Sequence, residues 1–183
     1  MNSDIIQSQR LDLFLLDETA LQQSLEAEKE TLQKTLGVTV PLDWFEEKEL
    51  ITLRLNQIQR EPEYQPWSVR AITLRDDRTM VGHIGFHTVP GADYLNTLAP
   101  NGVEFGYTIF RDFRRQGVAR EAALAVMEWA HQQHSVSQFV LSISPNNVPS
   151  LNLARGLGFQ KIGSHMDEED GVEEIYRLDY HPI

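Results

Sequence analysis

A stretch of ten residues, RDFRRQGVAR (111–120), holds four arginines and one glycine in a chain whose formal net charge is -11. The residues before it, 103–110, alternate as a strand does, and residues 119–134 have the composition of a helix. The first turn of a helix has N–H groups without acceptors and the positive end of the helix dipole, and arginines add charge-assisted hydrogen bonds to phosphate. Gly117 has no Cβ, so a ligand can approach the backbone closely. The stretch therefore predicts a seat for a phosphate or pyrophosphate group.

The arginines taken alone fit a solvated surface equally well, and the strand–glycine–helix order is what favours phosphate binding. The stretch lacks the GK[ST] ending of a Walker loop and the G-x-G-x-x-G of a dinucleotide-binding turn. The pattern thus indicates an anion site of another kind.

The motifs resemble those of the GCN5-related N-acetyltransferases, the GNAT superfamily. RRQGVA (114–119) matches the family's Q/R-x-x-G-x-G/A signature, and NNVPSLNLARGLGF (146–159) resembles its later N-x-x-S-x-x-L…GF motif. SQRLDLFLLDETA (8–20) is similar to the first strand of the Rim-type branch, whose members acetylate protein N-termini. VEFGYTIF (103–110) looks like that branch's strand before the phosphate loop. The order and spacing of these segments identify the chain as a GNAT-type protein.

The resemblance implies acetyl-CoA as acetyl donor, with its pantetheine arm beside the strand at 107–110 and its pyrophosphate on the N–H groups of 115–120. Asn147 and Ser150 belong to the second motif. The cofactor-binding residues that the resemblance implies, through backbone or side chain, are Tyr107, Thr108, Ile109, Phe110, Arg114, Arg115, Gln116, Gly117, Val118, Ala119, Arg120, Asn147 and Ser150.

Two residues are candidates for moving protons. An amine acceptor with a pKa of about 10 must lose a proton before it attacks, and Glu104, on the strand before the phosphate loop, can take that proton directly or through water. The alternative for Glu104 is a rim carboxylate that balances the arginines or anchors the substrate. Ala154 stands where many relatives have a tyrosine as general acid, so Ser150, or a water held by Asn147, is the replacement; Ser150 equally fits a cap of its short helix. Tyr176 and Tyr180 are further alternatives.

The elements that must position these residues read as a mixed α/β protein. The resemblance implies a mostly antiparallel twisted sheet that is splayed at the acetyl-CoA site and flanked by helices, in a single domain over 1–183. The expected strands are 11–16, 67–75, 79–89, 103–110, 137–144 and 173–180; the expected helices are 18–37, 41–59, 119–134 and 147–157; 61–67 and 90–102 are expected loops.

Composition excludes several functions. The chain has no cysteine, so a thiolate zinc site and a cysteine-borne acetyl intermediate are excluded, and transfer is expected to be direct, in a ternary complex. A pI near 4.9 argues against nucleic acid and anionic lipid as partners. No metal site is expected, because His83 and His87 would be about 13 Å apart on a strand. With no leader or membrane span visible, the chain is expected to be cytoplasmic.

The expected activity is acetyl-CoA-dependent N-acetyltransfer to a protein N-terminus or a small-molecule amine. The sequence does not choose between these acceptors, and it leaves a homodimer open. One alternative is a GNAT-fold module that binds acyl-CoA without turnover, which Ala154 favours and Glu104 disfavours. Another is a phosphate-loop protein that binds ATP instead of CoA.

Overall fold

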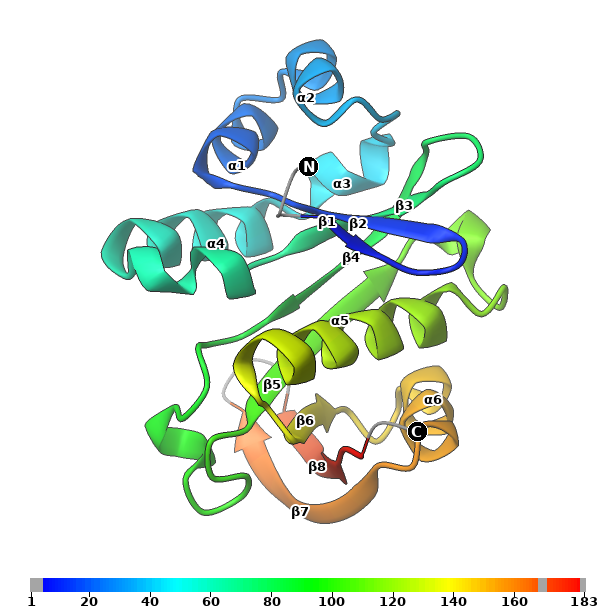
Figure 1. Ribbon diagram of the computed structural model, residues 1–183. Helices are drawn as coiled ribbons and strands as arrows, with labels where there is room; N and C mark the ends of the chain where they lie inside the picture. Colours follow the sequence, from blue (N-terminus) through cyan, green and yellow to red (C-terminus); the bar gives the residue numbers. More distant parts are fainter. Residues whose placement is uncertain (1–4, 168–170, 182–183) are drawn as a thin grey trace. The chain divides into compact units, whose positions relative to one another are not determined.

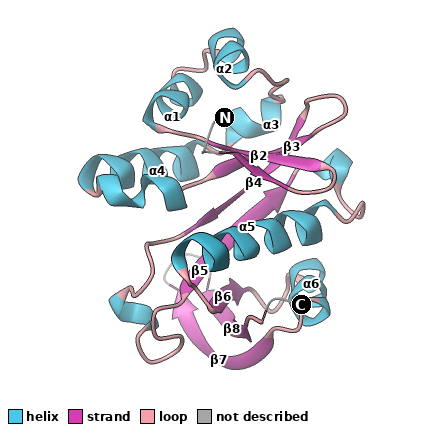
Figure 2. Cartoon of the chain, viewed as in Figure 1, coloured by secondary structure: helices cyan, strands magenta, loops and turns pink. Residues whose placement is uncertain are grey.

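The computed structural model describes residues 5–167 and 171–181, shown as ribbons in Figures 1 and 2. In this part of the chain the strands are β1 (Ile5–Gln7), β2 (Leu11–Leu15), β3 (Arg70–Leu74), β4 (Met80–Phe86), β5 (Val103–Ile109), β6 (Gln138–Ile143), β7 (Gln160–Asp167) and β8 (Gly171–Asp179). The helices are α1 (Glu18–Leu25), α2 (Lys29–Leu36), α3 (Leu42–Glu46), α4 (Lys48–Arg60), α5 (Val118–His134) and α6 (Val148–Gly156), with 3-10 turns η1 (Pro62–Trp67), η2 (Asp93–Leu95) and η3 (Arg111–Phe113).

The chain divides into two compact units, which are described here one at a time. The first comprises Met1–Gly85 and Tyr107–Ala125, and the second comprises Phe86–Gly106 and Val126–Ile183. Strands β4 and β5 and helix α5 each contribute residues to both units. The single domain expected over 1–183 stays a prediction.

The first unit is built on four antiparallel strands in the order β1-β2-β3-β4. Leu11, Leu13 and Ile72 are completely buried, and successive residues of β3 and β4 are buried on both faces of these strands. The last residues of β5 lie beside β4, where the N–H of Phe110 donates to the carbonyl of Val81 at 2.9 Å. This unit therefore holds the strand end from which the arginine-rich stretch departs.

The second unit contains the start of β5 and the antiparallel set β6-β8-β7. Strand β5 runs parallel to β6, with paired residues Val103–Phe139 and Glu104–Val140. A parallel pair needs a crossover, and α5 lies in the intervening sequence. Phe105 packs edge-on against both Phe139 and Phe159 in the core of this unit. The registered pairs of β5 and β6 end at Glu104, although both strands continue beyond their last pair.

The expected fold class is confirmed, because the strands form a mixed, mostly antiparallel set accompanied by helices. Several element predictions are wrong in detail. The helix expected over 18–37 is two helices, broken at Ala27 (φ 54°), and the helix expected over 41–59 is broken at Glu47. The sequence EAEKE (26–30) offers no apolar side chain larger than the methyl group of Ala27 for a continuous helix to bury, whereas Leu21 and Leu32 are buried on either side.

Strand β1, which pairs with β2, and the eight-residue strand β7, which pairs with β8, are absent from the sequence prediction. The loops expected over 61–67 and 90–102 contain the 3-10 turns η1 and η2. Within residues 5–167 and 171–181, no helix has the length and apolar character needed to cross a membrane.

Candidate active site

The arginine-rich stretch forms a turn at the start of α5, in the first unit. Arg115 (φ +62°) and Gly117 (φ +79°) both have left-handed backbone conformations, and α5 begins at Val118. The N–H of Glu121 donates to the carbonyl of Gly117 at 3.1 Å, which is the first hydrogen bond of the helix. The N–H groups of residues 118–120 therefore have no acceptor within the helix. The predicted glycine turn and helix start are present, and the anion seat stays a prediction.

The arginines of the turn differ in their contacts. All four are exposed. The Nε atom of Arg114 donates to the carbonyl of Ile109 at 2.8 Å, so this side chain ties the turn to the end of β5. Gln116 bonds within the turn, through its Nε2 to the carbonyl of Asp112 at 3.2 Å. Arg115 and Arg120 lie two residues before and three residues after Gly117 in the sequence.

The backbone of β5 presents alternate residues to opposite edges. Phe110 donates its N–H to Val81 on β4, and the carbonyl of Thr108 faces Gly82 on the same strand. Because successive backbone groups of a strand point to opposite sides, the N–H of Ile109 points away from β4. Of the residues expected beside the pantetheine arm, Ile109 is thus better oriented to donate to a ligand than Phe110, whose N–H is already bonded.

Gly82 allows β4 and β5 to approach each other closely. A Cβ built on it would lie 2.2 Å from the carbonyl oxygen of Thr108 and 3.0 Å from the Cα of Ile109. Sequence reasoning missed this residue. A glycine inside a strand pattern is itself a signal of close backbone approach.

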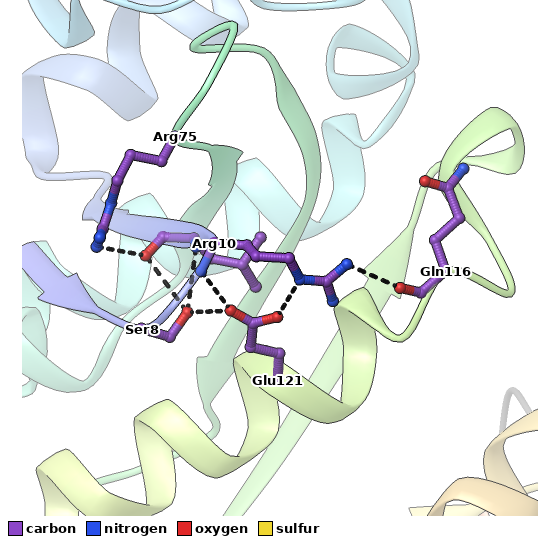
Figure 3. A network of polar contacts seen from close by, with 6 residues as sticks. Ser8, Arg10, Arg75, Gln116 and Glu121 are labelled. Atoms are coloured by element: carbon purple, nitrogen blue, oxygen red, sulfur yellow. Dashed lines mark hydrogen bonds and ion pairs between the residues drawn. The ribbon is translucent and has the colours of Figure 1, made fainter.

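Sequence reasoning also missed a polar network that contacts the turn. Glu121, in the first turn of α5, accepts hydrogen bonds from Ser8 and from the backbone and side chain of Arg10 (Figure 3). Arg10 also donates to the carbonyl of Gln116 at 3.2 Å. Burial raises the pKa of Glu121, but these hydrogen bonds and the charge of Arg10 hold it below its usual range. Sequence spacing gives no signal for a contact between residues 111 positions apart.

Glu104 lies in the second unit and is a buried carboxylate, only 6% exposed. Its Oε2 accepts a hydrogen bond from the hydroxyl of Tyr94 at 2.9 Å and lies 3.7 Å from Nδ1 of His87. Burial raises the pKa of Glu104, yet the hydrogen bond and charge of His87, with hydrogen bonds from Ser142 and Tyr94, lower it to about 2. Glu104 is therefore an anion at all physiological pH values.

Two side chains that contact the buried Glu104 reach the protein surface. His87 and Tyr94 are partly exposed, and Tyr94 belongs to the long segment between β4 and β5. A Cβ on Gly106 would lie 3.0 Å from Nε2 of His87, so the absence of a side chain there makes room for the imidazole. Sequence reasoning did not indicate Tyr94 as a neighbour of Glu104.

The second motif forms helix α6, also in the second unit. Asn147 is the N-cap, and its Oδ1 accepts the N–H of Ser150 at 3.2 Å. The sequence left a capping role open for Ser150, whereas the capping side chain is that of Asn147 and Ser150 contributes its backbone N–H to the bond. Ala154 is completely buried. Its methyl group cannot act as the general acid that the resemblance implies for a tyrosine at this position. Among the alternatives, the hydroxyl of Tyr176 donates to Glu174 at 2.9 Å.

His83 is buried in the first unit, among aromatic side chains. Its ring packs edge-on against Trp44 and Phe110, and its Nε2 lies 3.6 Å from Glu47. The contact with His83 lowers the pKa of Glu47, against the opposing effect of burial. In the part of the chain that the structure describes, no three His, Asp or Glu side chains are grouped so that they could hold a metal ion.

The predicted residues thus form two local arrangements. Residues 107–120 come together in the first unit as a strand end, a turn and a helix start. Glu104 in the second unit has its own cluster of polar neighbours, and Asn147 and Ser150 begin α6 in that unit.

Comparison with known proteins places these arrangements in a family. Residues 10–160 match the family model described as an acetyltransferase (GNAT) domain. YjdG of Bacillus subtilis, an uncharacterised N-acetyltransferase, is 26% identical over 159 residues, which are 87% of this chain and 88% of that protein. YnaD of the same organism, also uncharacterised, is 25% identical over 92 residues, and the match spans about half of each protein (50% and 49%).

Solved structures share the fold. An acetyltransferase of Salmonella typhimurium that modifies the N-terminal serine of ribosomal protein L7/L12 superposes with a TM-score of 0.63 at 17% identity, over 97% of this chain and 99% of that one. MccE, a microcin C7 self-immunity acetyltransferase solved with acetyl-CoA and AMP, gives 0.61 at 13% identity, over 94% of both chains. The first likeness agrees, at the level of fold, with the expected Rim-type branch. Because the family model covers most of the chain, the protein belongs to the acetyltransferase (GNAT) domain family.

Proposed function

We propose that this protein transfers the acetyl group of acetyl-CoA directly to an amine acceptor, a protein N-terminus or a small-molecule amine. The observation that carries the proposal is the turn at 114–120, within the family match, where left-handed residues and the open first turn of α5 offer N–H groups to a pyrophosphate. Arg115 and Arg120 supply positive charge at the same place. These features fit acetyl-CoA, whose pyrophosphate carries the charge that they would bind.

When bound, acetyl-CoA supplies the acetyl group, and its sulfur leaves as the amine nitrogen bonds to the carbonyl carbon. The N–H of Ile109 is oriented to hydrogen-bond the donor along β5. Without a cysteine the chain has no thiol to carry the acetyl group, which supports direct transfer in a ternary complex.

The role we propose for Glu104 is to anchor the acceptor. A pKa of about 2 lies far below that of either acceptor, about 8 for a protein N-terminus and about 10 for an alkylamine, so moving the proton from the amine to Glu104 is strongly unfavourable. Glu104 therefore holds the acceptor as a buried negative charge, and the proton leaves through water. Ser150 supplies the hydrogen bond to the departing sulfur, since Ala154 cannot.

A non-catalytic acyl-CoA-binding module is the second candidate, and the buried Ala154 is the observation that favours it. One experiment separates the readings. The chain is first tested for thermal stabilisation by CoA and by ATP, and thiol release from acetyl-CoA is then measured over peptides with free N-termini, polyamines and aminoglycosides. Stabilisation by CoA with turnover on an amine is expected. Stabilisation without turnover on any amine would identify the module, and stabilisation by ATP alone would contradict both.

A further inference from the structure

A polar network joins the turn between β1 and β2 to the first turn of α5 (Figure 3). Oε1 of Glu121 accepts the hydroxyl of Ser8 and the N–H of Arg10, both at 2.7 Å, and Oε2 accepts Nε of Arg10, also at 2.7 Å. Three donors thus hold one carboxylate, whose side chain is 16% exposed. All these residues lie in the first unit.

The far end of the Arg10 guanidinium reaches the turn itself. Nη1 donates to the carbonyl of Gln116 at 3.2 Å, and Nη2 would lie 3.4 Å from a Cβ on Gly117. The 116–117 peptide is trans, so its carbonyl and its N–H point in opposite directions. With the carbonyl held on the Arg10 side, the N–H of Gly117 faces the opposite side of the turn.

This orientation matters because glycine adopts positive and negative φ values with similar ease. Without a partner for the carbonyl, the peptide before Gly117 is free to turn over. The turned peptide would present a carbonyl oxygen, which repels an anion, where the N–H now stands. Glu121 in the same helical turn is a second source of repulsion, which the charge of Arg10 offsets.

We propose that Arg10 is a positioning residue for the acetyl-CoA turn, acting by fixing the Gln116–Gly117 peptide with its N–H toward the donor's pyrophosphate, while Glu121 holds Arg10 in place. The inference rests on the proposed function. It adds to that function a residue 106 positions away in sequence from the turn that it orders.

The test compares two acetyl donors. For Arg10→Ala, the KM for acetyl-CoA is expected to rise about tenfold, the effect of losing one hydrogen bond of a charged donor, while kcat changes little. With S-acetylpantetheine, which has no pyrophosphate, kcat/KM should be the same in Arg10→Ala and wild type. An equal loss with both donors, or no loss with acetyl-CoA, would overturn the proposal.

Two further variants keep the test decisive. Arg10→Lys retains a cation for Glu121 but lacks the second branch that reaches Gln116, so it should fold and still show weakened use of acetyl-CoA. Arg75→Ala is the matched control, because Arg75 bonds Asp12 and the Leu11 carbonyl in the same region without touching the turn. Its KM for acetyl-CoA should equal that of wild type, and a similar rise there would overturn the assignment to Arg10.

The double variant Arg10→Ala/Glu121→Gln separates peptide positioning from charge neutralisation. If Arg10 only offset the charge of Glu121, the double variant would bind as wild type does, which would overturn the positioning role; binding as weak as in Arg10→Ala is expected. Calorimetric titration with CoA tests the proposed function and the positioning role of Arg10 separately. A wild-type chain that binds no CoA contradicts the proposed function, whereas equal binding by wild type and Arg10→Ala contradicts the positioning role alone.

Discussion

At the scale of single residues, the chemistry of Glu104 is set by its neighbours more than by its position on a strand. The sequence located this carboxylate correctly on β5 and suggested either a base or an anchor. It could not reveal Tyr94, Ser142 and His87 around the side chain, which come from three separate segments. Since the base and anchor roles differ in the pKa they require, the choice between them depended on contacts that only the fold creates.

The anchor role predicts how substitutions at Glu104 and around it behave. Glu104→Gln should lower kcat/KM for the amine about 100-fold, the effect of losing a charged hydrogen-bond partner, while CoA affinity stays unchanged. His87→Ala removes the main cause that lowers the pKa of Glu104, so that pKa should rise. Amine kinetics measure the first effect, and an NMR titration of the Glu104 carboxyl measures the second.

Tyr94→Phe provides a graded control for the same measurement. The Tyr94 hydrogen bond is the smallest of the causes that lower the pKa of Glu104, so its removal should raise that pKa less than His87→Ala does. Loss of activity in His87→Ala with no change in the pKa of Glu104 would instead make His87 itself the proton acceptor.

Asn147 has a structural role that stability measurements can isolate. Its side chain caps α6, so Asn147→Ala should lower the free energy of unfolding by about 1 kcal/mol, while Asn147→Asp, which also caps well, should leave it nearly unchanged. Urea denaturation gives both values. If Asn147→Ala kept full stability but lost CoA affinity, the residue would be a cofactor ligand and its capping bond incidental.

At the scale of elements, the turn before α5 was predictable and the helices near the N-terminus were not. The turn is local, because strand, glycine and helix follow each other within residues 103–134, so the sequence pattern contains all three elements. The breaks at Ala27 and Glu47 depend on tertiary packing. The indole of Trp44 donates to the hydroxyl of Ser24 at 2.9 Å, a buried contact between α3 and α1 that no helix propensity encodes.

The close approach of β4 and β5 gives a prediction about an element pair. Gly82→Ala would put a methyl group against the carbonyl of Thr108, and backbone cannot yield as a flexible side chain can. The free energy of unfolding should fall by about 1–3 kcal/mol, as for overpacked cores, and KM for acetyl-CoA should rise because Ile109 moves. Gly163→Ala, in β7 with open space at its Cβ, is the matched control and should be neutral or slightly stabilising.

Chemical denaturation together with acetyl-CoA kinetics checks this pair of glycines. A Gly82→Ala variant as stable as Gly163→Ala would show that the strands separate without strain. In that case the alignment of Ile109 would not depend on the glycine.

At the scale of the whole molecule, composition and motif order were sufficient for the family but not for the acceptor. The sequence alone shows the two motifs in their expected order, the acidic composition and the absence of cysteine. The side chains of Tyr94 and His87, which surround the proposed acceptor anchor Glu104, come together only after folding. The division into two compact units is likewise a property of contacts, and the sequence carries no composition shift that marks it.

The pH dependence of the free energy of unfolding follows from the direction of the pKa shifts. Glu47, Glu104 and Glu121 have pKa values below their ordinary 4.5, so the unfolded chain binds more protons than the folded one at acid pH. Their stabilisation is complete above pH 4.5 and is lost as pH falls toward 2. Burial lowers the pKa of His134 below 6.5, which adds a smaller loss just below that pH. Burial raises the pKa of Tyr64, so its contribution is lost only above pH 10.

The free energy of unfolding is therefore expected to be level between about pH 7 and 10 and to fall steeply below pH 5. Glu104 alone should account for about 3 kcal/mol of that fall, since its pKa of about 2 lies 2.5 units below 4.5. Urea denaturation across the pH series measures the curve, and in Glu104→Gln the slope between pH 5 and 3 should be visibly smaller. An unchanged slope in that variant would mean that other carboxylates cause the acid loss, and that Glu104 is not the low-pKa anion on which its role as acceptor anchor depends.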